Sequence, residues 1–156
     1  MRVKICAVGR LRAGPERDLV DDYLARFDRT GRAVGLGPAR VVEVEDKRGG
    51  GPEAEAALLE RAVPQGAALC VLDERGQALE SPAFARRLAG WRDDGRGEAA
   101  LVLGGADGVA GALRGRADLI LSLGAMVWPH MLARAMLAEQ LYRAASILAG
   151  SPYHRA

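Results

Sequence analysis

Apolar residues are arranged along the chain in two alternating patterns. Short, mostly apolar runs, which are typical of strands, occupy residues 3–8, 40–44, 67–72, 99–103 and 119–123, and the run over 67–72 is fully apolar, as in a strand covered on both faces of a sheet. Between and after these runs, apolar residues recur every three or four positions, as they do on one face of a helix. This second pattern predicts helices that begin after Pro15 and that cover 54–62, 81–94 and 131–148.

The alternation of strands and helices predicts an α/β fold. We expect a mostly parallel sheet of five to six strands with helices on both faces. The length of 156 residues is typical of one domain, so residues 1–156 are expected to form a single domain. Ligands of such sheets bind outside the carboxyl ends of the strands. This rule points to Leu72, Gly104-Gly105 and the segment that follows Leu123.

Two helices carry more specific expectations. Ser81 and Pro82 predict a helix start, with the serine side chain as the cap and the proline at the first helical position. The last helix, over 131–148, has few polar residues and therefore needs cover on more than one side. A domain of this size can hardly supply that cover, so the helix favours a homodimer.

Composition and charge exclude several classes of protein. The net charge of +2 gives no sign of a basic tail that would bind nucleic acid. Cys6 and Cys70 lie far apart within apolar runs, which predicts buried reduced thiols and neither a disulfide nor a metal site. No segment approaches the ~20 apolar residues that cross a bilayer, and no signal peptide is recognisable. We therefore expect a cytoplasmic protein without a membrane or metal partner.

Two loops have unusual sequences. Residues 101–108, LVLGGADG, place paired glycines after a buried strand, but they match neither the dinucleotide-binding nor the P-loop pattern. They indicate either a tight turn or a backbone surface that a flat ligand can approach. Residues 124–129 form an apolar loop, which suits an adenine ring or else a buried connection.

The histidines and the polar end of the chain are candidates for chemistry. His130 and His154 are the only two histidines, and histidine is the usual general base near neutral pH. His154 belongs to the terminal segment SPYHRA, over 151–156. Chain ends are commonly frayed, so a dispensable tail is the alternative.

Taken together, these segments resemble one family. The terminal PYHR, the PH and EQLYRA motifs within 122–144, the LGG-x-x-G turn, KRG at 47–49 and LDERG at 72–76 closely resemble the RlmH family. These are the pseudouridine N3-methyltransferases of large-subunit (23S) ribosomal RNA, minimal members of the SPOUT superfamily. The resemblance covers essentially the whole chain.

The resemblance implies a C-terminal deep trefoil knot, S-adenosylmethionine (S-adenosyl-L-methionine) as cofactor, and a homodimer that acts on 23S rRNA within the ribosome. It implies catalytic roles for His130, Tyr153, His154 and Arg155. The implied cofactor-binding residues come from three segments of the chain. They are Leu72, Gly104, Gly105, Leu123, Gly124, Ala125, Met126, Val127, Trp128 and Pro129.

A mechanism follows from these implied roles. The N3 of a pseudouridine carries a proton, so we predict that His130 or His154 assists its removal and that Arg155 stabilises the charge that develops. Tyr153 would position the base. Four cations in predicted loops are candidates for phosphate contacts. They are Arg10, Arg12, Lys47 and Arg48.

The sequence departs from the family pattern at three places. Ala106-Asp107 replaces Pro-Glu after the double glycine, Trp128 replaces a common leucine, and Ala156 replaces a frequent terminal acid. Trp128 is expected to reshape the adenine pocket. The alternative function is a non-catalytic nucleotide-sensing or ribosome-binding module with the same fold.

Overall fold

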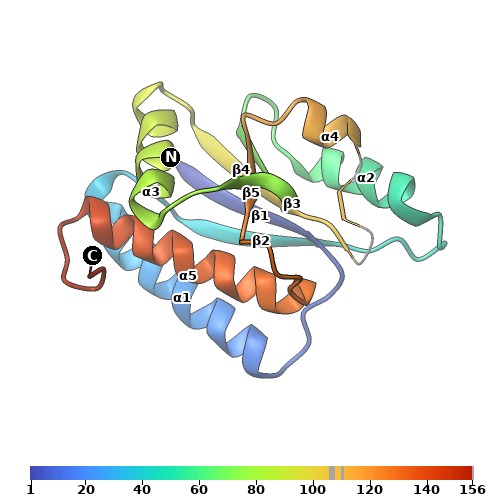
Figure 1. Cartoon of the computed structure of the whole chain (residues 1–156), viewed down its shortest axis with the longest axis horizontal. Coiled ribbons are helices and arrows are strands. Elements are labelled where there is room, and N and C mark those ends of the chain that lie inside the picture. Colours follow the sequence, from blue (N-terminus) through green and yellow to red (C-terminus); the bar gives the residue numbers. More distant parts are fainter. Residues whose placement is uncertain (106–107, 110, 156) are drawn as a thin grey trace.

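All five apolar runs form strands, and the computed structural model joins them into one parallel sheet in the order β2-β1-β4-β3-β5 (Figure 1). The structure describes residues 1–105, 108–109 and 111–155, so the sequence departures at Ala106-Asp107 and Ala156 lie outside it. The strand bounds are β1 Arg2–Val8, β2 Ala39–Val44, β3 Ala68–Ala78, β4 Glu98–Leu103 and β5 Leu119–Ser122.

The helices cover both faces of the sheet, as predicted. Their bounds are α1 Pro15–Gly31, α2 Gly51–Ala62, α3 Ser81–Asp93, α4 Gly111–Gly115 and α5 His130–Leu148, with a 3-10 turn, η1 Arg32–Val34, after α1. Figure 1 shows α1, α3 and α5 on one face, and α2 and α4 on the other. The short helix α4 was not predicted, because five residues with glycine at both ends show no helical periodicity.

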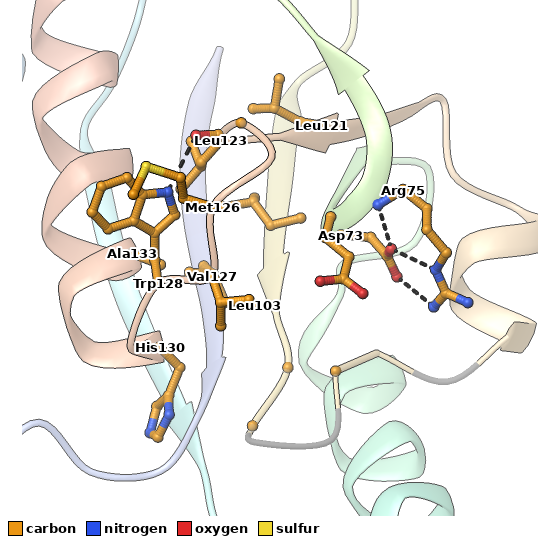
Figure 2. A pocket seen from close by; sticks show the side chains of 16 residues that line it. Asp73, Arg75, Leu103, Leu121, Leu123, Met126, Val127, Trp128, His130 and Ala133 are labelled. Carbon is orange, nitrogen blue, oxygen red and sulfur yellow. Dashed lines mark hydrogen bonds and ion pairs between the residues drawn. The ribbon is translucent and has the colours of Figure 1, made fainter.

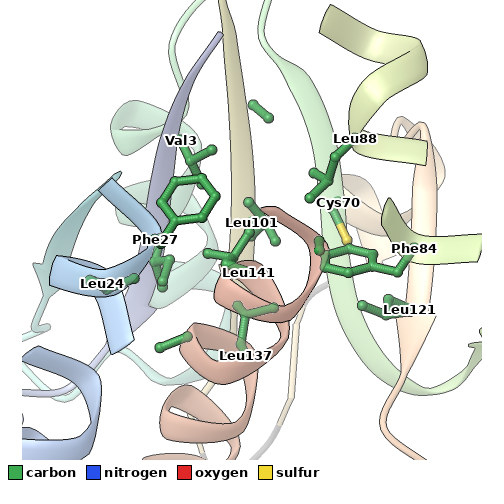
Figure 3. Close-up of a cluster of buried hydrophobic side chains, with 14 of the residues drawn as sticks. Val3, Leu24, Phe27, Cys70, Phe84, Leu88, Leu101, Leu121, Leu137 and Leu141 are labelled. Atoms are coloured by element: carbon green, nitrogen blue, oxygen red, sulfur yellow. The ribbon is translucent and has the colours of Figure 1, made fainter. Parts of the chain in front are cut away.

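Neighbouring residues of the central strands belong to two separate cores, one on each face. Ile5 and Leu101 belong to the larger core with residues of α1, α3 and α5, and Figure 3 shows Leu101 among them. Cys6 and Val102, the next residues along β1 and β4, pack against α2 and α4. Successive side chains of a strand point to opposite faces, so a strand covered on both sides must be apolar throughout. The largely apolar sequences of β1 and β4 therefore result from the two-sided cover.

Helix α5 obtains part of its cover from its own chain. It lies beside α1 and α3 on the sheet, and none of its residues from His130 to Leu148 is fully exposed. The two neighbouring helices bury one side of α5, whereas apolar residues such as Leu132 and Met136 stay half-buried. The need for further cover, and with it the homodimer, stays a prediction.

The start of α3 differs in part from the prediction. The helix begins at Ser81 with Pro82 in its first turn, as expected, but no side-chain hydrogen bond caps it. The Ser81 hydroxyl instead donates to Oε1 of Gln140 on α5, at 2.8 Å. The cap prediction was wrong because the adjacent helix α5 brings a side-chain acceptor within reach of the hydroxyl.

Strand β3 continues beyond its predicted end at Leu72 and interrupts its own ladder. Leu121 of β5 pairs with both Leu72 and Gln77, so residues 73–76 leave the ladder between the two pairs. At Gly76 a Cβ atom would lie 2.6 Å from the carbonyl oxygen of Ile120, and only glycine permits this approach. The excursion brings three polar residues of the LDERG motif to the edge of the sheet.

Cys6 and Cys70 are both free and buried, as predicted. Within the described ranges, none of the helices combines the length and apolar character required to cross a bilayer.

Candidate active site

A pocket of about 320 Å³ opens at the carboxyl edge of the sheet (Figure 2). Its floor comes from Leu103 and Leu121 near the ends of β4 and β5, and from Leu72, after which β3 leaves the ladder. The loops that follow these strands form its walls. The position agrees with the rule that ligands of parallel sheets bind outside the carboxyl ends of the strands.

Most of the predicted cofactor-binding residues meet in this pocket. Those that line it are Leu72, Gly104, Gly105, Leu123, Gly124, Met126, Val127 and Trp128. The structure does not bring Ala125 and Pro129 to the pocket, although they lie in the same loop and are exposed. His130, predicted as catalytic, also lines it.

Sequence reasoning missed seven lining residues. They are Asp73, Glu74, Arg75, Leu103, Gly108, Leu121 and Ala133. Asp73, Glu74 and Arg75 reach the pocket because of the excursion in β3, which interrupts the strand pairing. The LDERG motif was noticed for its family resemblance alone, and its run of charged residues directly after a buried strand was the available signal.

The paired glycines form a turn with no room for side chains. A Cβ atom on Gly104 would lie 2.1 Å from the carbonyl oxygen of Gly108, and one on Gly105 would lie 3.2 Å from Val8 Cγ1 and from Glu55 Oε2. Both glycines line the pocket, so a tight turn and an approachable backbone are features of the same structure.

The apolar loop after β5 is exposed, so its interpretation as a buried connection was wrong. Met126 is 72% exposed and Val127 is 85% exposed. The loop is fixed locally, because the indole Nε1–H of Trp128 donates to the carbonyl oxygen of Leu123 at 3.3 Å and Ser122 Oγ accepts from the Gly124 N–H at 3.1 Å. Exposed apolar side chains beside a pocket indicate a surface that a ligand or partner covers.

The opposite side of the pocket carries a buried carboxylate, Asp73 (Figure 2). Its side chain is 4% exposed and pairs with Arg75 Nε at 3.0 Å and with Arg114 Nη1 at 3.1 Å. The hydrogen bond from Arg75 is the main reason that the pKa of Asp73 falls to about 2. The carboxylate is therefore charged at neutral pH, and it ties the β3 excursion to α4.

Arg134 fixes the beginning of α5 next to the pocket. This side chain is only 1% exposed and pairs with Glu43 Oε2 of β2 at 2.8 Å. Its Nη2 donates to the carbonyl oxygens of Val8 at 3.1 Å and Gly9 at 3.0 Å, at the end of β1. The arginine thus joins the first turn of α5, where His130 and Ala133 line the pocket, to two strand ends.

The predicted tail residues lie elsewhere in the same chain. The Tyr153 hydroxyl donates to Glu139 Oε1 at 2.9 Å, and His154 Nδ1 lies 3.2 Å from Arg143 Nη1. Arg143 is 13 residues after His130, which corresponds to roughly 20 Å along the helix axis. Figure 1 shows the C-terminus beside the far end of α5. The structure does not bring Tyr153, His154 and Arg155 to the pocket of their own chain.

Burial and a hydrogen bond to Glu139 raise the pKa of Tyr153, so its phenol stays protonated. Among the described residues, no group of three or more His, Cys, Asp or Glu side chains is arranged to hold a metal ion.

A parallel sheet that bears a pocket, a glycine turn and an exposed apolar loop at its carboxyl edge is typical of α/β proteins that bind a small ligand at that edge. The family model described as "Predicted SPOUT methyltransferase" matches residues 1–154. The chain therefore belongs to the SPOUT methyltransferase family, and it is an enzyme that takes a methyl group from a donor.

Closely similar relatives carry one name, "Ribosomal RNA large subunit methyltransferase H". The protein of that name from Ruegeria pomeroyi is 72% identical over 155 residues and covers 99% of each chain. The one from Roseobacter denitrificans is also 72% identical, with the same coverage. A probable methylase family protein from Haemophilus influenzae has a similar fold, with a TM-score of 0.54 at 12% identity over 99% of this chain and 70% of the other. A probable methyltransferase from Bordetella pertussis gives a TM-score of 0.52 at 16% identity over 92% of this chain and 96% of the other.

Proposed function

We propose that this enzyme uses S-adenosylmethionine to methylate N3 of a pseudouridine in 23S ribosomal RNA, on assembled ribosomes in the cytoplasm, and that residues 1–156 act as one domain. The observation that carries the proposal is the pocket at the carboxyl edge of the sheet. It occurs in a SPOUT chain whose relatives are named as large-subunit ribosomal RNA methyltransferases.

The residues of the pocket fit this donor. The turn at Gly104 and Gly105 has no side chains, which leaves backbone available to a flat adenine ring. Met126 and Trp128 offer apolar surface beside it, and the loop backbone offers amides and carbonyls for the edge of the ring. Glu74 carries a carboxylate in the lining of a pocket for a ligand with a positively charged sulfur, whereas the charge of Asp73 is balanced by Arg75 and Arg114.

The protein's own task is to align the partners and to remove a proton. When bound, S-adenosylmethionine supplies a methyl group that its positively charged sulfur has already activated. Holding two reactants in line contributes ~7–11 kcal/mol to such a reaction. The N3 position of pseudouridine carries an imide proton that must leave, and His130, as the histidine that lines the pocket, is the candidate acceptor. Arg155 would stabilise negative charge on the neighbouring carbonyl oxygens.

Arg155 and Tyr153 can share one reaction with His130 only if two chains meet. The tail of one chain binds at Glu139 and Arg143, which lie roughly 9 and 15 Å along α5 from Ala133, the last residue of this helix that lines the pocket of that chain. We therefore propose a homodimer in which the tail of one protomer reaches the pocket of its partner. The exposed apolar loop at Met126 and Val127 supports this, because a partner would cover it. We also propose the trefoil knot of the family for the C-terminal segment.

The RNA would approach over the carboxyl ends of β1 and β2. Arg10 and Arg12 are exposed in the loop after β1, and Lys47 and Arg48 are exposed in the turn after β2. The two strands are neighbours and parallel, so both loops lie at the edge of the sheet that bears the pocket. Arginine and lysine at such an edge are suited to phosphate contacts.

Methyl incorporation from labelled S-adenosylmethionine tests the proposal. The labelled donor is incubated separately with intact ribosomes, isolated 23S rRNA and tRNA, and digested nucleosides are identified by mass spectrometry. We expect N3-methylpseudouridine from ribosomes lacking the modification. Donor binding without incorporation into any RNA would favour the non-catalytic module, and incorporation into tRNA alone would overturn the substrate.

A further inference from the structure

The last residues of the chain are held firmly against α5. The Tyr153 hydroxyl donates to Glu139 Oε1 at 2.9 Å, and its ring centroid lies 4.4 Å from that of Tyr142. The guanidinium carbon of Arg143 lies 4.8 Å from the centroid of the same Tyr153 ring. These contacts come from three residues of one helix face. The terminal segment therefore has a defined place next to Arg143.

The orientation of Arg143 is fixed by Glu139, one turn earlier on α5. Nε and Nη2 of the arginine lie 3.0 and 2.8 Å from the same carboxylate oxygen, Oε1. The other oxygen of Glu139 accepts a hydrogen bond of 2.7 Å from Gln140 Nε2. The side chains of Arg143 and Glu139 are 26% and 17% exposed, so water only partly screens the pair. The remaining nitrogen, Nη1, faces His154 Nδ1 at 3.2 Å.

This contact determines where His154 carries its proton. A guanidinium group has five N–H donors and no acceptor, and it does not lose its proton in proteins. A hydrogen bond between Arg143 Nη1 and His154 Nδ1 therefore requires that Nδ1 accept. A proton on Nδ1 would set two donors, and in the imidazolium form two cations, against each other. The neutral imidazole with its proton on Nε2 is the form that satisfies the contact.

We propose that Arg143 is a positioning residue that holds His154 as the Nε2–H tautomer, so that His154 serves the reaction as a hydrogen-bond donor and not as the proton acceptor. In this tautomer Nδ1 is the ring nitrogen with a free lone pair, and it already accepts the hydrogen bond from Arg143. Nε2–H is then the group offered to a substrate oxygen. The role of general base falls to His130, which lines the pocket.

The assignment of a substrate contact rests on the proposed methyl transfer, whereas the tautomer does not. The tautomer can be observed directly, because the chain contains only two histidines. Protein labelled with ¹⁵N in its imidazole rings gives two sets of long-range ¹H–¹⁵N correlations, which a His130→Asn variant assigns. At a pH where both rings are neutral, we expect the Nε2–H pattern for His154 with an unprotonated, hydrogen-bonded Nδ1.

Substitutions at Arg143 test the cause of this pattern. Arg143→Met removes the donor, and the His154 nitrogen shifts should move toward the average of exchanging tautomers. Arg143→Lys keeps a donor and should retain the Nε2–H pattern. Arg61→Met, on α2 at the opposite face of the sheet, is the matched control and should leave both rings unchanged. A dominant Nδ1–H tautomer in the wild type, or an unaltered pattern in Arg143→Met, would overturn the proposal.

The turnover rates of His154 variants distinguish a hydrogen-bond donor from a general base at this position. Glutamine can offer an amide N–H near the position of Nε2–H but cannot act as a base. We expect His154→Gln to keep kcat within about tenfold of the wild type and His154→Ala to fall well below it. If both variants fell alike by the ~10²–10⁴-fold of a lost general base, the donor role would be wrong. If the wild type methylated no RNA, the proposed function would fail while the NMR result still decided the tautomer.

Discussion

The buried Arg134 offers a sharp test of how the pocket is held together. Replacing it with methionine fills most of the volume but removes every polar contact of the guanidinium. Two backbone carbonyls at the end of β1, those of Val8 and Gly9, lose a charged donor each. The ion pair with Glu43, at 2.8 Å, is lost as well.

The expected loss of stability in Arg134→Met depends on how deeply each partner of Arg134 is buried. Removing one member of a fully buried ion pair costs ~3–5 kcal/mol, but the Glu43 side chain is 35% exposed and still accepts a hydrogen bond from the Leu11 N–H. Arg134 Nε has no hydrogen-bond partner within the described residues, which lowers the net value of the arginine. Hydrogen bonds to charged groups contribute ~1.5–3 kcal/mol each when their partners cannot reach water. We therefore expect Arg134→Met to lower the free energy of unfolding by about 3 kcal/mol.

Urea denaturation followed by circular dichroism measures this loss, at one fixed protein concentration because association would shift the midpoint. Arg134→Lys is the matched variant, since it keeps the positive charge but lacks the several N–H donors of the guanidinium group. Its free energy of unfolding should fall by about half as much as that of Arg134→Met. Combining Arg134→Met with Glu43→Gln should show a coupling energy of at least ~0.5 kcal/mol. The same Arg134→Met protein should bind the methyl donor more weakly, because His130 and Ala133 lie within the turn that the arginine fixes. A variant within ~0.5 kcal/mol of the wild type would refute the reasoning.

Three further predictions concern single features of the site and core. Asp73→Asn should lower stability at pH 7 by about 1–2 kcal/mol, because the folded-state pKa of about 2 lies below the unfolded value of ~3.9. This advantage is complete above the unfolded pKa, so in acid titrations the difference from the wild type should shrink as the pH falls below ~4 and vanish only below the folded pKa. Gly104→Ala should abolish donor binding in calorimetry while the sheet still folds, because its Cβ would lie 2.1 Å from Gly108 O and the turn must move. Unchanged affinity would contradict the role of the glycine turn in donor binding. Burial raises the pKa of Cys6 to about 11 and that of Cys70 to about 12, so neither thiol should react with Ellman's reagent at pH 8 until denaturant is added.

The sheet could be predicted because its burial leaves a direct trace in the sequence. Strands such as β1 and β4 are covered on both faces, and every residue in their centres must be apolar. The second half of β3 left no such trace, because Asp73 to Gly76 are polar residues that leave the ladder. A periodic pattern needs several turns of helix, so the five residues of α4 could not be recognised.

The parts of the site that depend only on where parallel strands end could be predicted from the sequence. Parallel strands end at one edge, so Leu72 and Gly105 could be expected to meet. The pairing of Asp73 with Arg114 joins residues 41 positions apart, and nothing local to either one indicates the other. The place of the tail was hidden for the same reason, because Glu139 and Arg143 read as ordinary polar residues of a helix until Tyr153 and His154 are seen against them.

Calorimetric titration with S-adenosylmethionine tests the central claim that the pocket at the carboxyl edge is the donor site. Ala133 lines this pocket from α5, and Ala133→Phe would fill part of the volume of about 320 Å³. Ala57→Phe makes the same change at an exposed position of α2 and serves as the control. We expect saturable binding to the wild type and to Ala57→Phe, with affinity lost in Ala133→Phe. An absence of binding to the wild type, or equal affinity in all three proteins, would contradict the claim.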